Sequence, residues 1–409
     1  MFIADLHLHS PYSRATSKDM DLEGMAHWSR KKGIHLLGSA DFTHPDWLSY
    51  LEKRLRPVGL GVYEFGGIKF LLQCEVSNIF SRNSRTYRVH TLIFAPDFDS
   101  VHRINEYLSR FGSLTSDGRP MLGLDIVKMS EDLTRICPDA FLIFAHIWTP
   151  WYSLFGSRSG FDGLREAFPD GVPENIFGFE TGLSSDPPMN WMVSELDNFP
   201  LLSNSDAHSP MNIGREANVF SEEVDFFRLR EILKRRDRSR FRFTVEFFPE
   251  EGKYHYDGHR VCGVVLHPEE SRRLNGICPV CSRPLTLGVL HRVLDLADRE
   301  TDQIREQDRI GYLHLVPLLD IIAYLRGKGK GSKTVLNEYT KLLDMGQEMD
   351  IVLNWEEERL KDVLPMDIAQ AVIRMRKGQV KVRPGYDGVY GKIEVDVSPA
   401  QGELFDLFD

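Results

Sequence analysis

Near its start the chain reads Asp5-Leu6-His7-Leu8-His9-Ser10, and this stretch decides the fold. Residues two apart on a strand share a face, so His7 and His9 project the same way. Leu6 and Leu8 then face the core. Two imidazoles placed in this manner can hold one metal ion. Alone, the motif is equally typical of two polar residues at a strand end, so its meaning depends on the rest of the chain.

Beyond this first motif, nearly all of the apolar runs in the first 220 residues are also followed by an ionisable residue. Core packing gives no reason for this recurrence, because burying an unpaired charge is costly. Carboxylates and imidazoles are, however, the ligands that hard and borderline divalent ions prefer. The pattern therefore predicts one metal site built from many strands. Its members are Asp41 and His44, Glu75, His90, His146, Glu180, and Asp206 with His208.

Short apolar runs alternate with helix-like stretches up to about residue 220, which indicates an α/β domain with a largely parallel sheet. The polar residues fall at or just past strand ends, where α/β barrels place their active sites. The predicted strands are Phe2–Leu8, His35–Ser39, Lys69–Cys74, Arg88–Phe94, Ala140–Ala145, Ile176–Glu180 and Leu201–Ser203. The predicted helices are Met20–Lys32, Val101–Phe111, Leu124–Ile136 and Met189–Asn198.

Taken together, these motifs resemble the PHP (polymerase and histidinol phosphatase) family. The resemblance implies a distorted (β/α)7 barrel with two or three divalent ions (Zn, Mg or Mn). Members of that family usually have Asp and His at adjacent positions, whereas this chain has Asp41-Phe42-Thr43-His44. Which of Asp41 and His44 is the metal ligand therefore stays open. Glu180 has no firm counterpart and is expected to lie behind the ligands. The family pattern assigns His7, His9, Glu75 and Asp206 to one ion, Glu75, His90 and His146 to a second, and His44 and His208 with Asp41 to a third.

A site of this kind is suited to phosphoester hydrolysis. One metal lowers the pKa of a bound water, and another neutralises charge that develops on phosphoryl and leaving oxygens. We expect Asp206, His208 and Glu75 to be the catalytic residues. The loss of Asp206 is expected to damage the site most.

The five cysteines point to a second metal site. An odd, clustered count fits a metal site in a reducing compartment better than a disulfide framework. His259-x2-Cys262 and Cys278-x2-Cys281 have the spacing of a structural zinc site with four ligands. A redox CxxC is the alternative. The fourth ligand stays open, because His255 could replace His259.

The net charge of −10 argues weakly against nucleic-acid binding when taken globally. Basic tracts are nevertheless concentrated: Arg228–Arg242 carries eight Arg or Lys against two acids. With the zinc module and the Gly-Lys loop at 327–333, this tract is interpreted as phosphate-binding charge. A charge run is more often a solvated face, but three runs beside a phosphoesterase-like site favour a nucleic-acid substrate.

The order of PHP domain, HxxC…CxxC module and helical C-terminal domain resembles the endonuclease Q family of DNA repair nucleases. The resemblance covers nearly the whole chain. It implies a metal-dependent endonuclease that cuts on the 5′ side of a deaminated base (uracil, hypoxanthine or xanthine) or an abasic site. The alternatives are a PHP phosphatase acting on small esters such as histidinol phosphate, and a non-catalytic DNA-binding scaffold.

The predicted organisation has four parts. Residues 1–225 form the PHP domain, 226–300 the basic segment and zinc module, 301–400 a mainly helical domain with a terminal hairpin, and 401–409 a tail. No apolar run of about 18 residues occurs, so no membrane span is predicted. The first residues lack a signal-peptide pattern, which predicts a cytoplasmic protein, nucleoid-associated through DNA.

Two weaker signals concern partners. A damaged base needs an aromatic, partly polar pocket into which it can rotate. The expected substrate contacts are Tyr12, Arg14, Trp148, Trp151 and Tyr152, although aromatic loop residues are more often local packing. The tail Gln401–Phe408 contains Q-x-x-L-F, which resembles the peptide that docks on sliding clamps. A tail that folds back on its own domain is the alternative.

Overall fold

Strand β1 (Phe2–Asp5) lies in the middle of one curled sheet that forms the body of the protein. The structure, a computed structural model, describes residues 1–395. Along the sheet the strands follow the order β10-β9-β8-β6-β5-β2-β1-β11-β12-β15. The strands of this path are β2 (Leu36–Gly38), β5 (Ile68–Arg82), β6 (Arg85–Ala95), β8 (Phe141–Phe144), β9 (Ile176–Glu180), β10 (Leu201–Leu202), β11 (Ala217–Phe220), β12 (Phe241–Glu246) and β15 (Gly311–His314).

The strand directions bring several carboxyl ends to one edge of the sheet. β1, β2 and β5 are mutually parallel, and so are β8, β9 and β10. β6 and β11 run antiparallel to their neighbours. Three short strands lie off this path: β3 (Arg56–Gly59), β4 (Val62–Phe65) and β7 (Met121–Leu122). The predicted α/β class and PHP-type barrel are therefore confirmed.

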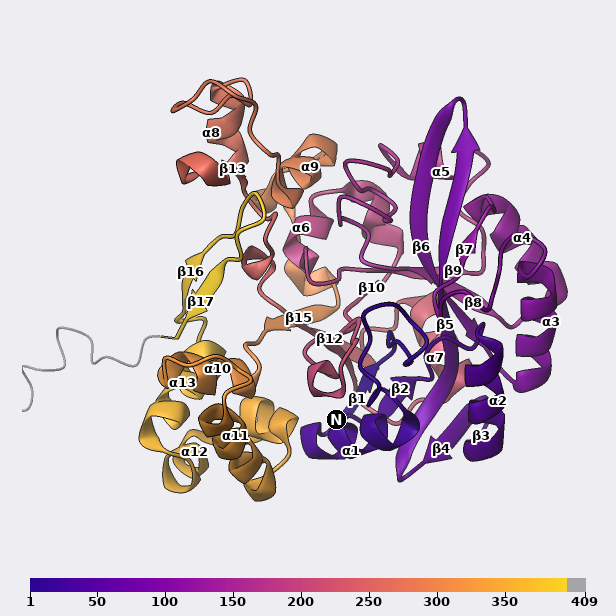
Figure 1. Cartoon of the computed structure of the whole chain (residues 1–409), viewed down its shortest axis with the longest axis horizontal. Coiled ribbons are helices and arrows are strands. Elements are labelled where there is room, and N and C mark those ends of the chain that lie inside the picture. Colours follow the sequence, from indigo (N-terminus) through magenta and orange to yellow (C-terminus); the bar gives the residue numbers. More distant parts are fainter. Residues whose placement is uncertain (396–409) are drawn as a thin grey trace, which may run out of the picture.

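Helices surround the barrel, and short acidic side chains fix where several of them begin (Figure 1). Asp21, Asp97 and Asp225 each accept a hydrogen bond from a backbone N–H of the following first turn. Such caps satisfy amide groups that the helix leaves unpaired. The helices are α1 (Leu22–Lys32), α2 (Pro45–Arg54), α3 (Phe98–Leu108), α4 (Ile126–Ile136), α5 (Leu164–Ala167), α6 (Pro187–Trp191) and α7 (Phe226–Arg235).

Helix α7 closes the end of the barrel opposite the carboxyl ends of β8 and β9. The ring of Phe226 lies 5.3 Å from that of Phe141, at the start of β8. Arg230 lies over Phe177, near the start of β9. The basic tract that begins on α7 therefore lies away from the residues that follow these strands. Arg228 and Arg235 are also paired with glutamates, and the phosphate-binding role of the tract stays a prediction.

The sheet continues past the predicted domain boundary at residue 225. β12 pairs with β11, and β15 pairs with β12, so both strands extend the barrel sheet. A small module follows β12, with the hairpin β13 (Asp257–His259) and β14 (Val264–Leu266) and the helices α8 (Pro268–Arg273) and α9 (Val289–Leu296). It projects from one side of the barrel (Figure 1).

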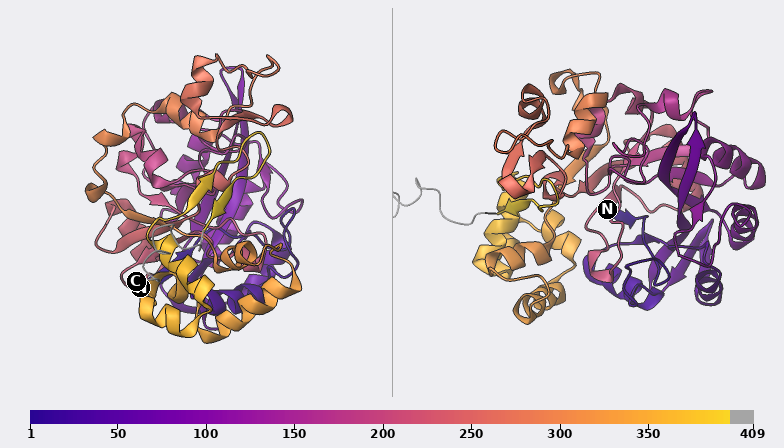
Figure 2. Two further views of the ribbon diagram at one scale, coloured as in Figure 1. Left: turned by 90° about the vertical axis from the view of Figure 1, so that its left-hand side faces the viewer. Right: turned by 45° about the horizontal axis from the view of Figure 1, so that its top comes forward.

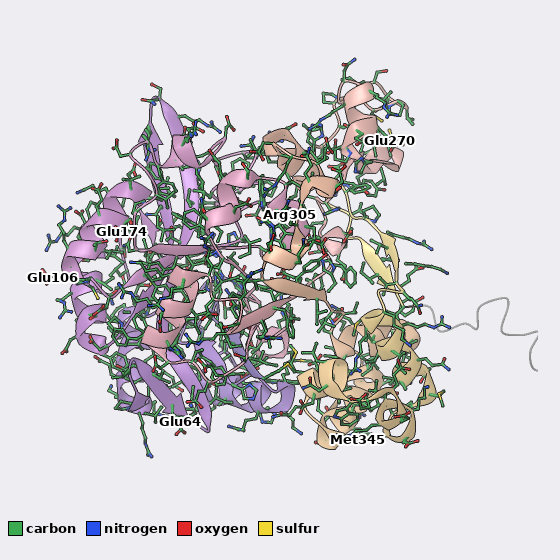
Figure 3. The ribbon with its side chains drawn as sticks, turned by 180° about the vertical axis from the view of Figure 1, so that it is seen from behind. Glu64, Glu106, Glu174, Glu270, Arg305 and Met345 are labelled. Carbon is green, nitrogen blue, oxygen red and sulfur yellow. The ribbon has the colours of Figure 1, made fainter. Side chains whose placement is uncertain are left out.

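A helical domain follows, with α10 (Leu318–Leu325), α11 (Lys333–Met345), α12 (Glu357–Val363) and α13 (Met366–Arg376). The hairpin of β16 (Lys381–Arg383) and β17 (Lys392–Glu394) comes after it. This domain and the small module lie along the same side of the barrel (Figure 2). From behind, Glu106 and Glu174 point outward from the barrel and Met345 lies at the edge of the helical domain (Figure 3). Among the described residues no helix is long and apolar enough to cross a membrane.

Candidate metal centre

Four side chains from three distant parts of the chain meet just beyond the end of β1. The Nε2 atoms of His7 and His9 lie 3.4 and 3.2 Å from one Glu75 oxygen. Asp206, which follows β10, places Oδ1 2.9 Å from His9 Nε2 and 3.6 Å from His7 Nε2. One ligand atom from each of the four residues lies within 4.8 Å of all the others. This is a donor set able to hold one divalent ion.

A second group shares Glu75 with the first. The other Glu75 oxygen lies 2.8 Å from His90 Nδ1 and 3.4 Å from His146 Nε2. The two imidazole nitrogens are 3.3 Å apart. Because each oxygen of Glu75 faces a different group, this carboxylate is placed to bridge two cations.

Four donor atoms of this centre make no hydrogen bond among the described residues, which tests whether a cation fits. His7 Nε2, His9 Nε2, Glu75 Oε1 and Asp206 Oδ1 are buried and accept or donate no hydrogen bond. A buried polar atom left unpaired costs about 1–3 kcal/mol. Four such atoms that converge on one place fit bound divalent ions.

Two further carboxylates hold the imidazoles from behind. Glu180 lies 3.0 Å from His7 Nδ1 and accepts hydrogen bonds from the His146 backbone N–H and from Asn204. Asp41 lies 3.3 Å from His9 Nδ1 and accepts from the backbone and hydroxyl of Ser10. Contacts of this kind fix the tautomer of a metal-binding histidine and the direction of its ring.

The residues expected to hold a third ion do not form a comparable group among the described residues. Both carboxylate oxygens of Asp41 are engaged near His9: Oδ1 lies 3.3 Å from His9 Nδ1, and Oδ2 accepts a hydrogen bond from the Ser10 N–H. His44 lies just before α2, with its ring 4.2 Å from the ring of Tyr12. His208 lies 4.3 Å from the ring of His9 and 3.6 Å from Asp206. The third ion and its ligands therefore stay a prediction.

Backbone conformation is unusual at three of these residues. Asp41, His146 and Asp206 have positive φ angles of 25°, 31° and 47°. L-residues rarely adopt this region, and such conformations concentrate at functional sites. The strained turns aim these side chains back across the ends of the strands.

The charges of the centre depend on one another. Burial lowers the pKa of His7, but the carboxylates of Glu180 and Glu75 outweigh it and raise that pKa well above its ordinary value. Burial raises the pKa of Asp206, and the nearby His7 and His9 overcome this effect and bring the pKa well below its usual range.

The small module brings together the second predicted donor set. One ligand atom from each of His259, Cys262, Cys278 and Cys281 lies within 4.8 Å of the others. His259 Nδ1 lies 3.3 Å from Cys281 Sγ. His255, the alternative ligand, is buried beside Tyr256 and does not join the group. The geometry favours His259 in a site of structural zinc type.

Known proteins resemble the chain over most or all of its length. Residues 317–379 match the family model described as the MJ0043 C-terminal domain. The chain is 30% identical over 408 residues to the uncharacterized protein YqxK of Bacillus subtilis (strain 168), covering 96% of this chain and 98% of YqxK. It is 33% identical over 257 residues to the uncharacterized protein MJ0043 of Methanocaldococcus jannaschii, covering 60% of this chain but 31% of that protein.

Two solved structures are similar along the whole chain. The lesion-specific endonuclease PfuEndoQ from Pyrococcus furiosus matches with a TM-score of 0.86 and 32% identity, covering 100% of this chain and 99% of the other. The chain belongs to the endonuclease Q family. Endonuclease Q in complex with a 27-mer duplex carrying an abasic lesion at the active site matches with a TM-score of 0.83 and 32% identity, covering 97% of each chain.

The expected substrate contacts of this endonuclease Q family member differ in accessibility. Tyr12 and Trp151 are 42% and 54% exposed, and Arg14 is also exposed. Tyr152 is half-buried, with its ring 4.9 Å from that of His90. Trp148 is only 1% exposed and donates its indole N–H to Asn190. A base cannot stack on a side chain that is buried in this way. Trp148 therefore packs in the core, and the predicted contact of Trp148 with the substrate is wrong.

A cavity of about 450 Å³ opens beside the metal centre. Thr149 and Pro150 line one side, directly after His146, and Thr149 Oγ1 lies 3.3 Å from His146 Nδ1. Phe247 and Tyr254, from the segment after β12, line it as well. This cavity was not predicted, because its walls come from segments that are scattered along the chain between Thr149 and Tyr390.

One charged residue at the centre was not predicted. Arg119 lies in the loop before β7 and donates from Nη1 to Glu75 Oε2 at 3.0 Å. Its neighbours in sequence, Asp117, Gly118 and Pro120, indicate a turn and carry no ligand pattern. Only the fold shows that this turn reaches the metal centre.

Proposed function

We propose that the chain cleaves the phosphodiester on the 5′ side of a deaminated base (uracil, hypoxanthine or xanthine) or an abasic site in DNA. It is a metal-dependent DNA endonuclease that acts in DNA repair. One observation carries the lesion specificity: the chain matches, along 97% of its length, endonuclease Q with an abasic duplex at the active site. The donor set around Glu75 is consistent with that chemistry.

The chain uses divalent metal. We assign one ion to His7, His9, Glu75 and Asp206, and a second to Glu75, His90 and His146. A third, with His44 and His208 as ligands, is proposed from the family pattern alone. When bound, Zn, Mg or Mn ions supply a water of lowered pKa and neutralise charge on phosphoryl oxygens. A structural zinc is proposed for the module, held by His259, Cys262, Cys278 and Cys281.

The residues of the chain have distinct tasks in this reaction. Glu75 and Asp206 concentrate negative charge where the ions bind, and both reach the imidazoles of β1. Glu180 and Asp41 keep the rings of His7 and His9 aimed at that place. With Glu75 and Asp206, His208 is proposed as the third catalytic residue; its side chain is 28% exposed beside Asp206.

The cavity beside His146 is the proposed place for a base rotated out of the duplex. Its volume of about 450 Å³ is ample for one nucleobase. Aromatic and apolar walls from Phe247, Tyr254 and Pro249 suit a planar ring, and Arg215 and His255 add polar groups. Tyr12, Arg14, Trp151 and Tyr152 are proposed to contact DNA nearer the metal centre.

A nicking assay tests this function. Duplexes labelled on one strand and carrying a single uracil, hypoxanthine or abasic site are incubated with Mg²⁺, Mn²⁺ or Zn²⁺, beside an undamaged duplex. We expect one cut 5′ to the lesion and none in the undamaged strand. Rapid phosphate release from small esters without lesion-dependent cutting would favour the phosphatase, and DNA binding without either reaction would favour a scaffold.

Asp206→Ala checks that the metal centre is responsible. Removing this carboxylate should reduce cleavage at least a thousandfold while the affinity for lesion DNA falls less than about threefold, since basic contacts supply most of the affinity. Asp170→Ala, an exposed carboxylate in the loop before β9, is the matched control. Full activity in Asp206→Ala would place the reaction elsewhere.

Docking on a sliding clamp through Gln401–Phe408 is a separate proposal, and these residues lie outside the described part of the chain. The Q-x-x-L-F pattern alone supports it. Deleting residues 401–409 should abolish clamp pull-down while nicking of free oligonucleotides stays unchanged. Unchanged pull-down would end this proposal.

A further inference from the structure

The guanidinium of Arg119 reaches the metal centre. Its Nη1 lies 3.0 Å from the Glu75 oxygen that also faces His7 and His9. Within residues 1–395, no other Arg or Lys forms an ion pair with Glu75 or Asp206. The positively charged guanidinium of Arg119 therefore lies beside the two proposed metal sites, at the carboxylate of Glu75 that both sites share.

The loop that carries Arg119 is fixed to three sides of the centre. The Gly118 N–H donates to the Tyr12 carbonyl at 3.0 Å, and Thr43 Oγ1 donates to the Gly118 carbonyl at 3.1 Å. The next residue, Pro120, accepts from the Ser77 N–H at 2.9 Å. A side chain at Gly118 would place its Cβ 2.4 Å from Asp41. Arg119 is thus held by backbone contacts with the loops after β1 and β2 and with β5.

Most of the donors of this side chain are free. A guanidinium has five N–H groups in a planar fork. Among the described residues, Glu75 is the only hydrogen-bond acceptor of the Arg119 side chain. The side chain is also 26% exposed, whereas Glu75 is fully buried. Arg119 therefore joins the buried carboxylate to the open side of the centre.

We propose that Arg119 binds a non-bridging oxygen of the scissile phosphate, while Nη1 stays on Glu75. The inference rests on the proposed function and names a contact within it. Guanidinium pairs with phosphate oxygens through two parallel hydrogen bonds, and such charge-assisted bonds are stronger than neutral ones. A cation fixed where negative charge develops also stabilises the transition state.

Binding without added Mg²⁺ or Mn²⁺ tests this contact separately from cleavage. The full-length protein, with its zinc module loaded and no chelator present, is titrated against a fluorescent duplex with one abasic site; anisotropy gives the Kd, and a gel checks that the duplex stays uncut. A second duplex carries an uncharged methylphosphonate at the linkage 5′ to the lesion, and a third carries it several linkages away. For the unmodified protein we expect about tenfold weaker binding when the scissile linkage is neutral, and little change when the remote linkage is.

Arg119→Gln should bind the normal duplex about tenfold more weakly than the unmodified protein does. It should bind the duplex with the neutral scissile linkage no more weakly than that, because the substitution and the neutral linkage remove the same contact. Arg119→Lys keeps the charge without the fork and should lie between. Arg135→Gln, on the exposed end of α4, is the matched control and should bind like the unmodified protein. Circular dichroism checks that each variant is folded.

Additive losses from Arg119→Gln and the neutral linkage would overturn the inference, as would normal DNA binding by Arg119→Gln. If that variant fails to fold, the unmodified protein still decides: equal effects of the two methylphosphonates would overturn the contact. Failure of the proposed function looks different, because the unmodified protein would then not cut any lesion duplex with metal present.

Discussion

At the scale of single residues, the carboxylates behind the imidazoles matter as much as the donors in front. Asp41 accepts three hydrogen bonds, from Ser10 N, Ser10 Oγ and Ser13 Oγ, in addition to its contact with His9. An oxygen already so engaged is poorly placed to bind a metal ion. We therefore propose that Asp41 positions the ring of His9.

Asp41→Asn tests that role. The amide keeps the shape but loses the charge, so we expect metal affinity to fall about 10- to 100-fold while the number of bound ions stays the same. Titration calorimetry with Mn²⁺ measures both quantities, with Asp170→Asn as control. One ion fewer, bound at unchanged affinity, would make Asp41 a direct ligand, which the spacing of Asp41 and His44 left open.

A buried carboxyl pair at the start of β11 and the end of β12 gives a pH dependence. Glu216 and Glu246 are fully buried, and burial raises the pKa of Glu246 from 4.5 to about 8. The folded state thus keeps a proton that the unfolded chain releases above pH 4.5. This part of the stability is present below pH 4.5 and is lost as the pH rises to about 8.

Glu246→Gln should remove that loss, since the amide carries no charge and can still bond to Thr181 and Thr244. One group contributes up to about 1.4 kcal/mol per pH unit over this interval. In thermal unfolding between pH 5 and pH 8.5, the melting temperature should fall less steeply with pH for the variant than for the unmodified protein. Parallel curves would show that Glu246 is ionised in the fold.

At the scale of elements, the sequence predicted most barrel strands because buried strands are continuous apolar runs. Strand β9 was predicted with its observed bounds, Ile176–Glu180. The long hairpin of β5 and β6 was predicted too short, because its outer half is polar and turns at Asn83-Ser84. Helix α2 was not predicted. The position of Arg119 was not predicted either, because a loop residue meets a distant strand only through the fold.

The zinc module should depend on its metal. It has little apolar core, and Val261 and Val280, each next to a cysteine, are 83% and 68% exposed. The proposed zinc ion would therefore supply much of the folding energy of this module. Under a strong chelator, limited proteolysis should cut within residues 255–290 while far-UV circular dichroism changes little. Cys281→Ser should be cut there without chelator, and resistance in both cases would contradict a zinc-dependent module.

At the scale of the whole molecule, the helical domain is fixed to the barrel through α1. Lys32 Nζ lies 3.1 Å from Glu348, and both side chains are almost fully buried. Glu348 also accepts hydrogen bonds from Tyr339 and from the Leu318 N–H. No motif in the sequence indicated this ion pair, because its partners are more than 300 residues apart.

Lys32→Met should destabilise the protein by about 3–5 kcal/mol, because it leaves a buried charge without its partner. Lys31→Met is the matched control: Lys31 pairs with the exposed Asp344, so its loss should cost less than about 1 kcal/mol. Urea unfolding of the two variants measures the difference. Equal effects would mean that Lys32 contributes no more than a surface pair.

The central claim is that Glu75 bridges two cations at the ends of the barrel strands. Anomalous diffraction from crystals soaked in Mn²⁺ tests it most directly. Two peaks are expected around Glu75, one among His7, His9, Glu75 and Asp206 and one among Glu75, His90 and His146. Crystals with Mn²⁺ elsewhere on the protein and no peak beside Glu75 would contradict it.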